Sequence, residues 1–231
     1  MPRPQALLAT AALAALLAAP AYAGSLFGGQ VVHQEDNSPM VTGSGKRVTQ
    51  TRNVSGFDSI QAKSAIELEV TVGPQASASI EFDDNLIQAI TTEVRGKTLL
   101  IDSKGSWSAG KDPHVRITLP SLNALSNEGS GEVSITGLDG GDLALRLIGS
   151  ADIHAKGQVA SLGVLLNGSG DLHLYDLSAD TVKVRLNGSG DVEVTANKTL
   201  EAAVYGSGDI DYRGNATVTQ QVYGSGSIEK K

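Results

Sequence analysis

The sequence predicts an all-β protein whose C-terminal half is a parallel β-solenoid. Three observations lead to this prediction. A Gly-Ser-Gly tripeptide recurs at a nearly constant spacing, apolar and polar residues alternate on both sides of it, and aromatic residues make up only 4% of the chain. Self-similarity at a fixed period indicates a repeat architecture, and alternation with period two is typical of strands. With so few rings, the core must consist of Val, Ile, Leu and Ala.

The repeat occupies residues 121–231 and contains six units that align on their first glycine. These glycines are Gly129, Gly149, Gly168, Gly188, Gly206 and Gly224, at separations of 20, 19, 20, 18 and 18 residues. In one unit Val182, Val184 and Leu186 alternate with polar residues. A two-strand unit cannot bury its apolar face alone, so we expect the units to stack as rungs around one aliphatic core. Right-handed coiling is the default for parallel crossovers.

The glycines of the repeat are predicted to be structural, at corners where a Cβ atom would clash or φ must be positive. They are Gly129, Gly131, Gly149, Gly168, Gly170, Gly188, Gly190, Gly206, Gly208, Gly224 and Gly226. The second unit departs from the pattern, because Ala151 replaces its second glycine. The intervening serine can hydrogen-bond the turn backbone locally. A flexible linker would not keep apolar alternation in register over six units, so we reject that interpretation.

Two segments precede the folded part. Residues 1–23 have the features of a signal peptide, with a short apolar run and an Ala-Tyr-Ala cleavage signal that ends at Ala23. Residues 24–50 are rich in small polar residues and are expected to form a flexible leader. The protein is therefore predicted to be exported, to the periplasm or to the cell surface, with no integral membrane segment after cleavage.

Residues 51–120 are predicted to form a β-rich segment that leads into the solenoid. Residues 66–72 alternate apolar and polar side chains, as expected for a strand with one buried face. Asp83 and the two residues after it provide an N-cap for a short helical stretch from Leu86 to Ile90. Order is expected to begin near Arg52.

Composition excludes several classes of function. The formal net charge of −7 argues against nucleic acid or an anionic membrane surface as partner, because both need a basic face. The absence of Cys excludes disulfides and a thiol nucleophile. The sequence contains no nucleophile elbow, phosphate loop or metalloprotease motif. We predict a protein that is not an enzyme and that needs no cofactor.

Four aspartates occupy equivalent positions in successive units: Asp152, Asp171, Asp191 and Asp209. In a parallel stack they would lie about 4.8 Å apart. Such a column could bind calcium, since hard cations take carboxylate oxygens. The period, however, is much longer than that of calcium-binding nonapeptides. We therefore favour a structural role, in which each carboxylate accepts backbone N–H groups at its corner as in an Asx turn.

Two other side-chain groups have a possible ligand role. His154 and His173 are equivalent outward residues and could share a zinc ion, but only Glu193 could serve nearby as a third ligand. Exposed histidines without metal are the favoured interpretation. Tyr205, Tyr212 and Tyr223 fall in the last two units, where rings could stack on sugars or cover the end of the core. We favour the covering role.

Several motifs are similar to those of a known family. They are the stretch from Val54 to Ile60, the stretch from Leu119 to Leu125, and the Gly-Ser-Gly-Asp unit that begins at Tyr205. With these, residues 54–231 resemble the head GIN domain family of adhesin-like bacterial envelope proteins. The resemblance implies a β-helical fold and export to the envelope, and it brings no catalytic residues.

The predicted function is a structural or adhesin-like binding module of the envelope. Its partner would be a glycan, a cell-wall component or a surface protein, because the flat sides of solenoids suit such contacts. One alternative is a β-helical polysaccharide-active enzyme, although the short loops between units form no evident groove. The other alternative is a calcium-binding repeat protein.

Overall fold

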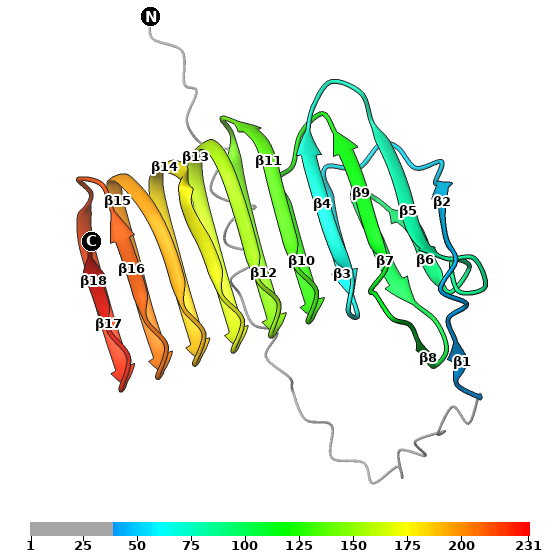
Figure 1. Ribbon diagram of the computed structural model, residues 1–231. Coiled ribbons are helices and arrows are strands. Elements are labelled where there is room, and N and C mark those ends of the chain that lie inside the picture. Colours follow the sequence, from blue (N-terminus) through cyan, green and yellow to red (C-terminus); the bar gives the residue numbers. More distant parts are fainter. Residues whose placement is uncertain (1–38) are drawn as a thin grey trace, which may run out of the picture.

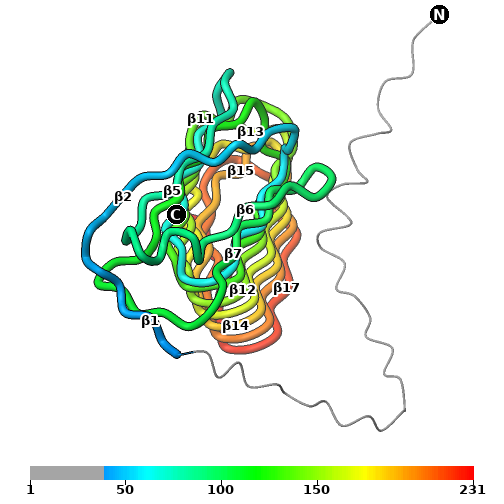
Figure 2. Tube along the Cα trace, turned by 90° about the vertical axis from the view of Figure 1, so that its right-hand side faces the viewer, coloured from blue at the N-terminus to red at the C-terminus, as the bar shows by residue number. Residues whose placement is uncertain are grey.

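The computed structural model describes residues 39–231, which form strands and turns with no helix (Figure 1). The predicted signal peptide and the first part of the expected leader lie outside these residues. Most strands stack side by side as the rungs of a parallel β-solenoid, as the repeat predicts. Seen from one end, the chain winds in flattened loops around a common interior (Figure 2).

The solenoid has two broad faces, here named after the side chains they carry outward. The tyrosine face contains β3 (Ser59–Lys63), β7 (Thr98–Ser103), β10 (Ala124–Gly129), β12 (Asp142–Gly149) and β17 (Thr217–Gly224). The histidine face contains β4 (Glu67–Val72), β9 (His114–Leu119), β11 (Val133–Asp139), β16 (Ile210–Arg213) and β18 (Ile228–Lys230). Three long strands bend from the histidine face to the tyrosine face, namely β13 (Ile153–Gly168), β14 (Leu172–Gly188) and β15 (Val192–Gly206).

The interior is filled by aliphatic side chains in register. One column runs through Leu145, Val164, Val184 and Ala202, which are paired from strand to strand and are at most 1% exposed. Lys183 and Arg185 alternate with these residues and point outward, as the sequence predicts. Because side chains alternate with period two, a slip of one residue would turn the whole column toward solvent.

In every unit except the second, which has Ala151, two glycines allow successive rungs to approach closely at one corner. Gly188 has a φ of 141°, and a Cβ atom there would lie 2.0 Å from the carbonyl oxygen of Gly168 in the preceding rung. A Cβ atom on Gly190 would lie 2.0 Å from the carbonyl oxygen of Gly170. The corner is tied by a backbone bond, in which the N–H of Ser189 donates to Gly168 at 3.0 Å. The glycines are therefore needed both for the close contact between rungs and for the turn itself.

The solenoid begins earlier than residue 121. Strands β3 and β4 pair in parallel with β10 and β11, and so form a rung below the first Gly-Ser-Gly unit. Ser64 takes the corner position of the first glycine, with a φ of 72°. A Cβ atom on Gly129 would lie 2.1 Å from the Ser64 carbonyl oxygen. Strands β7 and β9 add a further rung outside this one.

Antiparallel strands close the N-terminal end of the stack. They are β2 (Arg47–Thr51) and β5 (Ser77–Asp83) on one face and β6 (Ile90–Arg95) on the other, and β1 (Val41–Thr42) pairs with β8 (Trp107–Ser108) beside them. Phe82 is fully buried and meets Trp107 edge to face, with ring centroids 5.1 Å apart. We call the part of residues 39–119 that lies outside the rung strands β3, β4, β7 and β9 the N-terminal cap.

Two expectations for this region are wrong. The leader was expected to reach residue 50, but β1 and all but the last residue of β2 are strands within it. The helical stretch expected from Leu86 to Ile90 is a series of turns that ends where β6 begins. The Asp83 side chain does not cap a helix, because its Oδ2 accepts the N–H of Gly45 at 2.9 Å and so holds the N-terminal strand segment.

Candidate binding face

The outer surface of the histidine face carries a straight column of polar side chains. Cross-strand pairing places them in register, one from each successive strand: Ser134, His154, His173, Glu193, Asp211 and Glu229. Successive strands of a sheet lie about 4.8 Å apart, so these side chains are regularly spaced along the solenoid axis.

The two histidines stack on one another. Their ring centroids are 4.7 Å apart and the ring planes differ by 16°. Each ring has a carboxylate neighbour, since Nδ1 of His173 lies 3.1 Å from Glu193 and Nε2 of His154 lies 3.9 Å from Glu132. Within residues 39–231, no three His, Cys, Asp or Glu side chains are grouped so that they could hold a metal ion.

A second outward column lies beside the first and includes Tyr175 and Arg213. The Arg213 guanidinium carbon lies 3.8 Å from the centre of the Tyr175 ring. It reaches the ring across β15, where Thr195 pairs with Arg213 and bonds the carbonyl oxygen of Tyr175 at 2.8 Å. Burial, and then the carboxylates of Asp211 and Glu193, raise the pKa of Tyr175, so its hydroxyl stays a hydrogen-bond donor.

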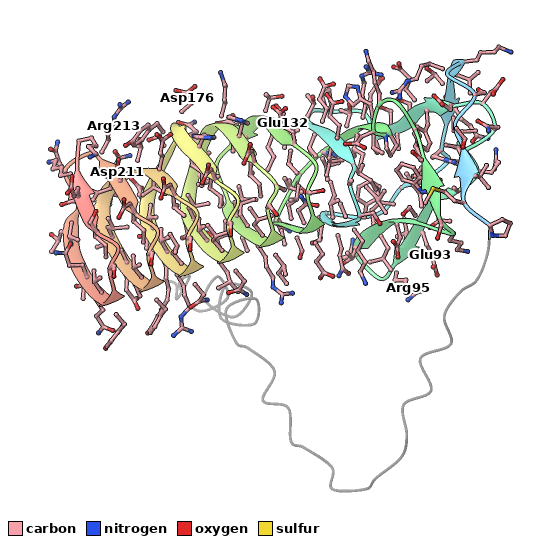
Figure 3. All side chains as sticks on the ribbon, turned by 60° about the horizontal axis from the view of Figure 1, so that its bottom comes forward. Glu93, Arg95, Glu132, Asp176, Asp211 and Arg213 are labelled. Carbon is pink, nitrogen blue, oxygen red and sulfur yellow. The ribbon has the colours of Figure 1, made fainter. Side chains whose placement is uncertain are left out.

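The two columns enclose a shallow hollow of about 270 Å³. Its lining includes His154, His173, Tyr175, Glu193 and Arg213, together with Lys156 and Asp176. Figure 3 shows Glu132, Asp176, Asp211 and Arg213 on one side of the solenoid, away from Glu93 and Arg95 of the cap. The hollow offers both donors and acceptors, which suits a ligand with several polar groups.

A larger hollow of about 560 Å³ lies on the same face nearer the cap. Glu81 is shared there by two arginines, at 3.2 Å from Arg116 and 3.5 Å from Arg47. The hydrogen bond from Arg116, and then that from Arg47, hold the pKa of Glu81 below its ordinary value. Glu69 lies 3.3 Å from Arg116 and 3.4 Å from His114. Both arginines and His114 of this hollow thus lie beside carboxylates, whereas Lys111 and Glu67 line it without an ion pair among the described residues.

The four candidate aspartates form a ladder of hydrogen bonds between rungs. The N–H of Asp191 donates to Oδ1 of Asp171 at 2.8 Å, and that of Asp209 donates to Asp191 at 2.9 Å. Asp152 accepts from Asp171 at 3.3 Å, and Asp209 accepts from Ser227 at 2.6 Å. The partner is thus the N–H of the next rung and not of the residue's own corner, as an Asx turn would require.

The three candidate tyrosines do not form one cluster. Tyr205 and Tyr223 stack on the tyrosine face with centroids 5.0 Å apart, and Arg185 lies 5.0 Å over the Tyr205 ring. Tyr212 lies in β16 of the histidine face and packs against the core. Sequence reasoning missed Tyr175 and Arg213, although both follow the aspartate of their own unit by four positions, which would have placed them in one column.

Comparison with known proteins gives a family and a fold. The model of the family described as "Putative auto-transporter adhesin, head GIN domain" matches residues 56–216. A structure titled as a putative adhesin from Bacteroides fragilis is 25% identical with a TM-score of 0.64, covering 83% of this chain and 100% of its own. A search of curated proteins found no match. No helix within residues 39–231 has the length and apolar character needed to cross a membrane.

Two further structures share the fold at lower identity. A putative adhesin from Parabacteroides merdae is 19% identical with a TM-score of 0.55, covering 83% of this chain and 99% of its own. A structure from Parabacteroides distasonis titled as a putative lipid binding protein is 23% identical with a TM-score of 0.51, covering 84% of this chain and 100% of its own.

Proposed function

Because the chain belongs to the head GIN domain family of auto-transporter adhesin type, we propose that it is an exported, non-catalytic module that binds a glycan of the cell envelope. The binding surface is the histidine face. Export follows from the predicted signal peptide. The intact mass of the exported protein is expected to match a chain that begins at Gly24.

The observation that carries this proposal is the regular outward column through His154, His173 and Glu193. A glycan is a chain of similar polar units, and a parallel solenoid presents similar polar groups at each rung. A polymer lying along the axis would therefore meet donors and acceptors at successive rungs. The hollows on this face are lined by charged and polar side chains, which favours sugar hydroxyls over an acyl chain.

The proposal that the module is non-catalytic rests on the carboxyl groups. A glycoside hydrolase of the common type needs one carboxyl group whose pKa is raised, to act as general acid. The pKa of Glu81, of Asp84 and of Glu93 is lowered, in each case first by a side-chain hydrogen bond and also by a nearby cation. These displacements favour permanent ion pairs over acid catalysis.

The test is binding of the exported protein to arrays of neutral and acidic polysaccharides and to cell-wall fragments. We expect retention that falls in the double variant His173→Ala, Glu193→Ala. The matched control is Lys183→Ala with Glu201→Ala, an ion pair at 2.9 Å on the tyrosine face. Sustained release of sugar would overturn the assignment of the module as non-catalytic. If the protein were retained only by envelope proteins, the proposal that its ligand is a glycan would be overturned.

A further inference from the structure

Of the lysine and arginine side chains that line the smaller hollow, only one has no anionic partner among the described residues. Lys156 pairs with Asp176 at 3.3 Å, and Lys231 pairs with Asp211 at 3.3 Å. Arg116 is shared between Glu69 and Glu81. Among the described residues, Arg213 forms neither an ion pair nor a hydrogen bond, although it lines the smaller hollow.

The Arg213 guanidinium packs against the Tyr175 ring, as arginine commonly does on aromatic faces. With its carbon 3.8 Å from the ring centre, one flat side of the group is covered. Its N–H donors lie in the guanidinium plane and are not used by the ring. A guanidinium presents these donors as a rigid fork that matches the two oxygens of a carboxylate. A fork that is already held in place loses less freedom when it binds.

In the lining of the hollow, Arg213 has no carboxylate partner and Glu193 has no lysine or arginine partner. Asp176 is engaged by Lys156, and Glu193 lies 3.1 Å from His173. These side chains keep oxygen atoms that can accept hydrogen bonds from hydroxyl groups. The Tyr175 hydroxyl and the free edges of the imidazoles can donate or accept. The hollow therefore combines one carboxylate-binding fork with several groups suited to hydroxyls.

We propose that this hollow is a subsite for a uronic acid residue of a polysaccharide, with Arg213 binding the sugar carboxylate. The inference rests on the proposed function and narrows it to acidic glycans. Tyr175 is the residue that positions the fork. The paired network around Glu81 nearer the cap would contact neutral parts of the same polymer, because its arginines are already neutralised.

Three polymers test the subsite at an ionic strength of about 0.15 M, where the Debye length is about 8 Å and long-range repulsion by the net negative charge is screened. They are polygalacturonate, its methyl ester, which keeps the backbone and removes the charge, and dextran sulfate, an anionic polymer without carboxylates. We expect the parent protein to bind polygalacturonate at least tenfold more tightly than the ester. Equal binding of both would overturn the acidic subsite while leaving the glycan proposal intact.

Variants then assign the effect to one side chain. Arg213→Gln is expected to lower affinity for polygalacturonate about tenfold and to leave the ester unaffected. Arg213→Lys keeps the charge but not the fork, so it should recover little of the loss. The matched control is Arg185→Gln, which removes an arginine that also lies over a tyrosine but on the opposite face. Thermal melts of each variant check that the fold is kept.

Each remaining outcome is decisive. Full recovery by Arg213→Lys, or equal affinity for dextran sulfate, would overturn recognition by the fork, because charge alone would then suffice. An equal loss in Arg185→Gln would place binding elsewhere on the solenoid and overturn the subsite. If none of these polymers binds while the protein still retains neutral envelope glycans, the uronic acid assignment fails and the proposed function stands. If no glycan of any kind binds, the proposed function fails as well.

Discussion

The N-terminal cap and the repeat rungs bury their apolar residues in different ways. The rungs use equivalent layers, in which a column of aliphatic side chains such as Leu145, Val164 and Val184 continues from strand to strand. The cap uses single contacts that occur once, such as the Phe82–Trp107 pair and the Asp83 bond to Gly45. A rung can therefore be disrupted by changing its repeated element, and the cap only by changing a particular contact.

The largest effect is expected from Gly188→Val in the middle of the rungs. The new Cβ atom would lie 2.0 Å, 2.9 Å and 3.1 Å from the O, C and N atoms of Gly168, and no side chain can move to relieve this contact. The φ of 141° adds strain for a β-branched residue. We expect a loss of about 4 kcal/mol or more, an unusually large value for one substitution.

Urea unfolding measures this loss, with Lys183→Ala as the control. Lys183 makes an exposed ion pair with Glu201, and such pairs contribute about 1 kcal/mol or less. If Gly188→Val unfolded at the same urea concentration as the parent, close contact between rungs at this corner would be disproved.

The next largest effect is expected from Phe82→Ala in the cap. Phe82 is fully buried against Trp107, and truncation of a buried Phe costs about 3–5 kcal/mol. Because the contact occurs once, the loss should concentrate in the cap strands β2, β5 and β6. Hydrogen exchange should then quicken there before it quickens in β14. Uniform acceleration along the solenoid would show that cap and rungs unfold as one unit.

The same difference explains what the sequence could predict. In the rungs each residue type recurs, so periodicity identified the corners, the inward column and the positions of the aspartates. In the rung of β3 and β4, Ser64 replaces the glycine and Ile66 the second one, so the motif was lost although the alternation remained. The Asp83 bond to Gly45 joins residues 38 apart without any repeat, and no local pattern indicates it.

The candidate site shows the same limit. The aspartate ladder and the histidine pair were foreseen as columns, because alignment of the units gives equivalent positions. Alignment of the units does not give the direction of each aspartate side chain. The hydrogen bond from one rung to the next was therefore predicted as a local Asx turn. Arg213 contacts Tyr175 across the intervening strand β15, where Thr195 lies between them, and alignment of the units alone does not indicate a contact between side chains two strands apart.

A smaller, opposite effect is expected from Asn127→Leu. Asn127 points into the core, and its two amide atoms are buried without a hydrogen-bond partner among the described residues. The equivalent residue in the next rung is Leu147. An unsatisfied buried polar group costs about 1–3 kcal/mol, so the leucine should raise stability by a similar amount. The melting temperature should rise, by about 2–4 °C per kcal/mol for a chain of this size.

Asn127→Ala is the control, because it removes the amide but leaves space beside Ala62. Its melting temperature should fall below that of the leucine variant. A lower melting temperature for Asn127→Leu than for the parent would mean that the amide is satisfied in solution and helps to specify this rung.

The smallest effect is expected when calcium is added or chelated, because the aspartate ladder is already occupied by backbone N–H groups. Calcium at 100 times its Kd would add about 2.7 kcal/mol to the stability of the native state. At about 2–4 °C per kcal/mol, the melting temperature would then rise by roughly 5–11 °C. We expect no such shift.

The substitution Asp171→Asn should also change stability little, since an amide oxygen still accepts the N–H of Asp191. Asp171→Ala leaves that donor unpaired and should cost about 1 kcal/mol more. A calcium-dependent rise that disappears in Asp171→Asn would instead make the column a cation site and the rungs dependent on it.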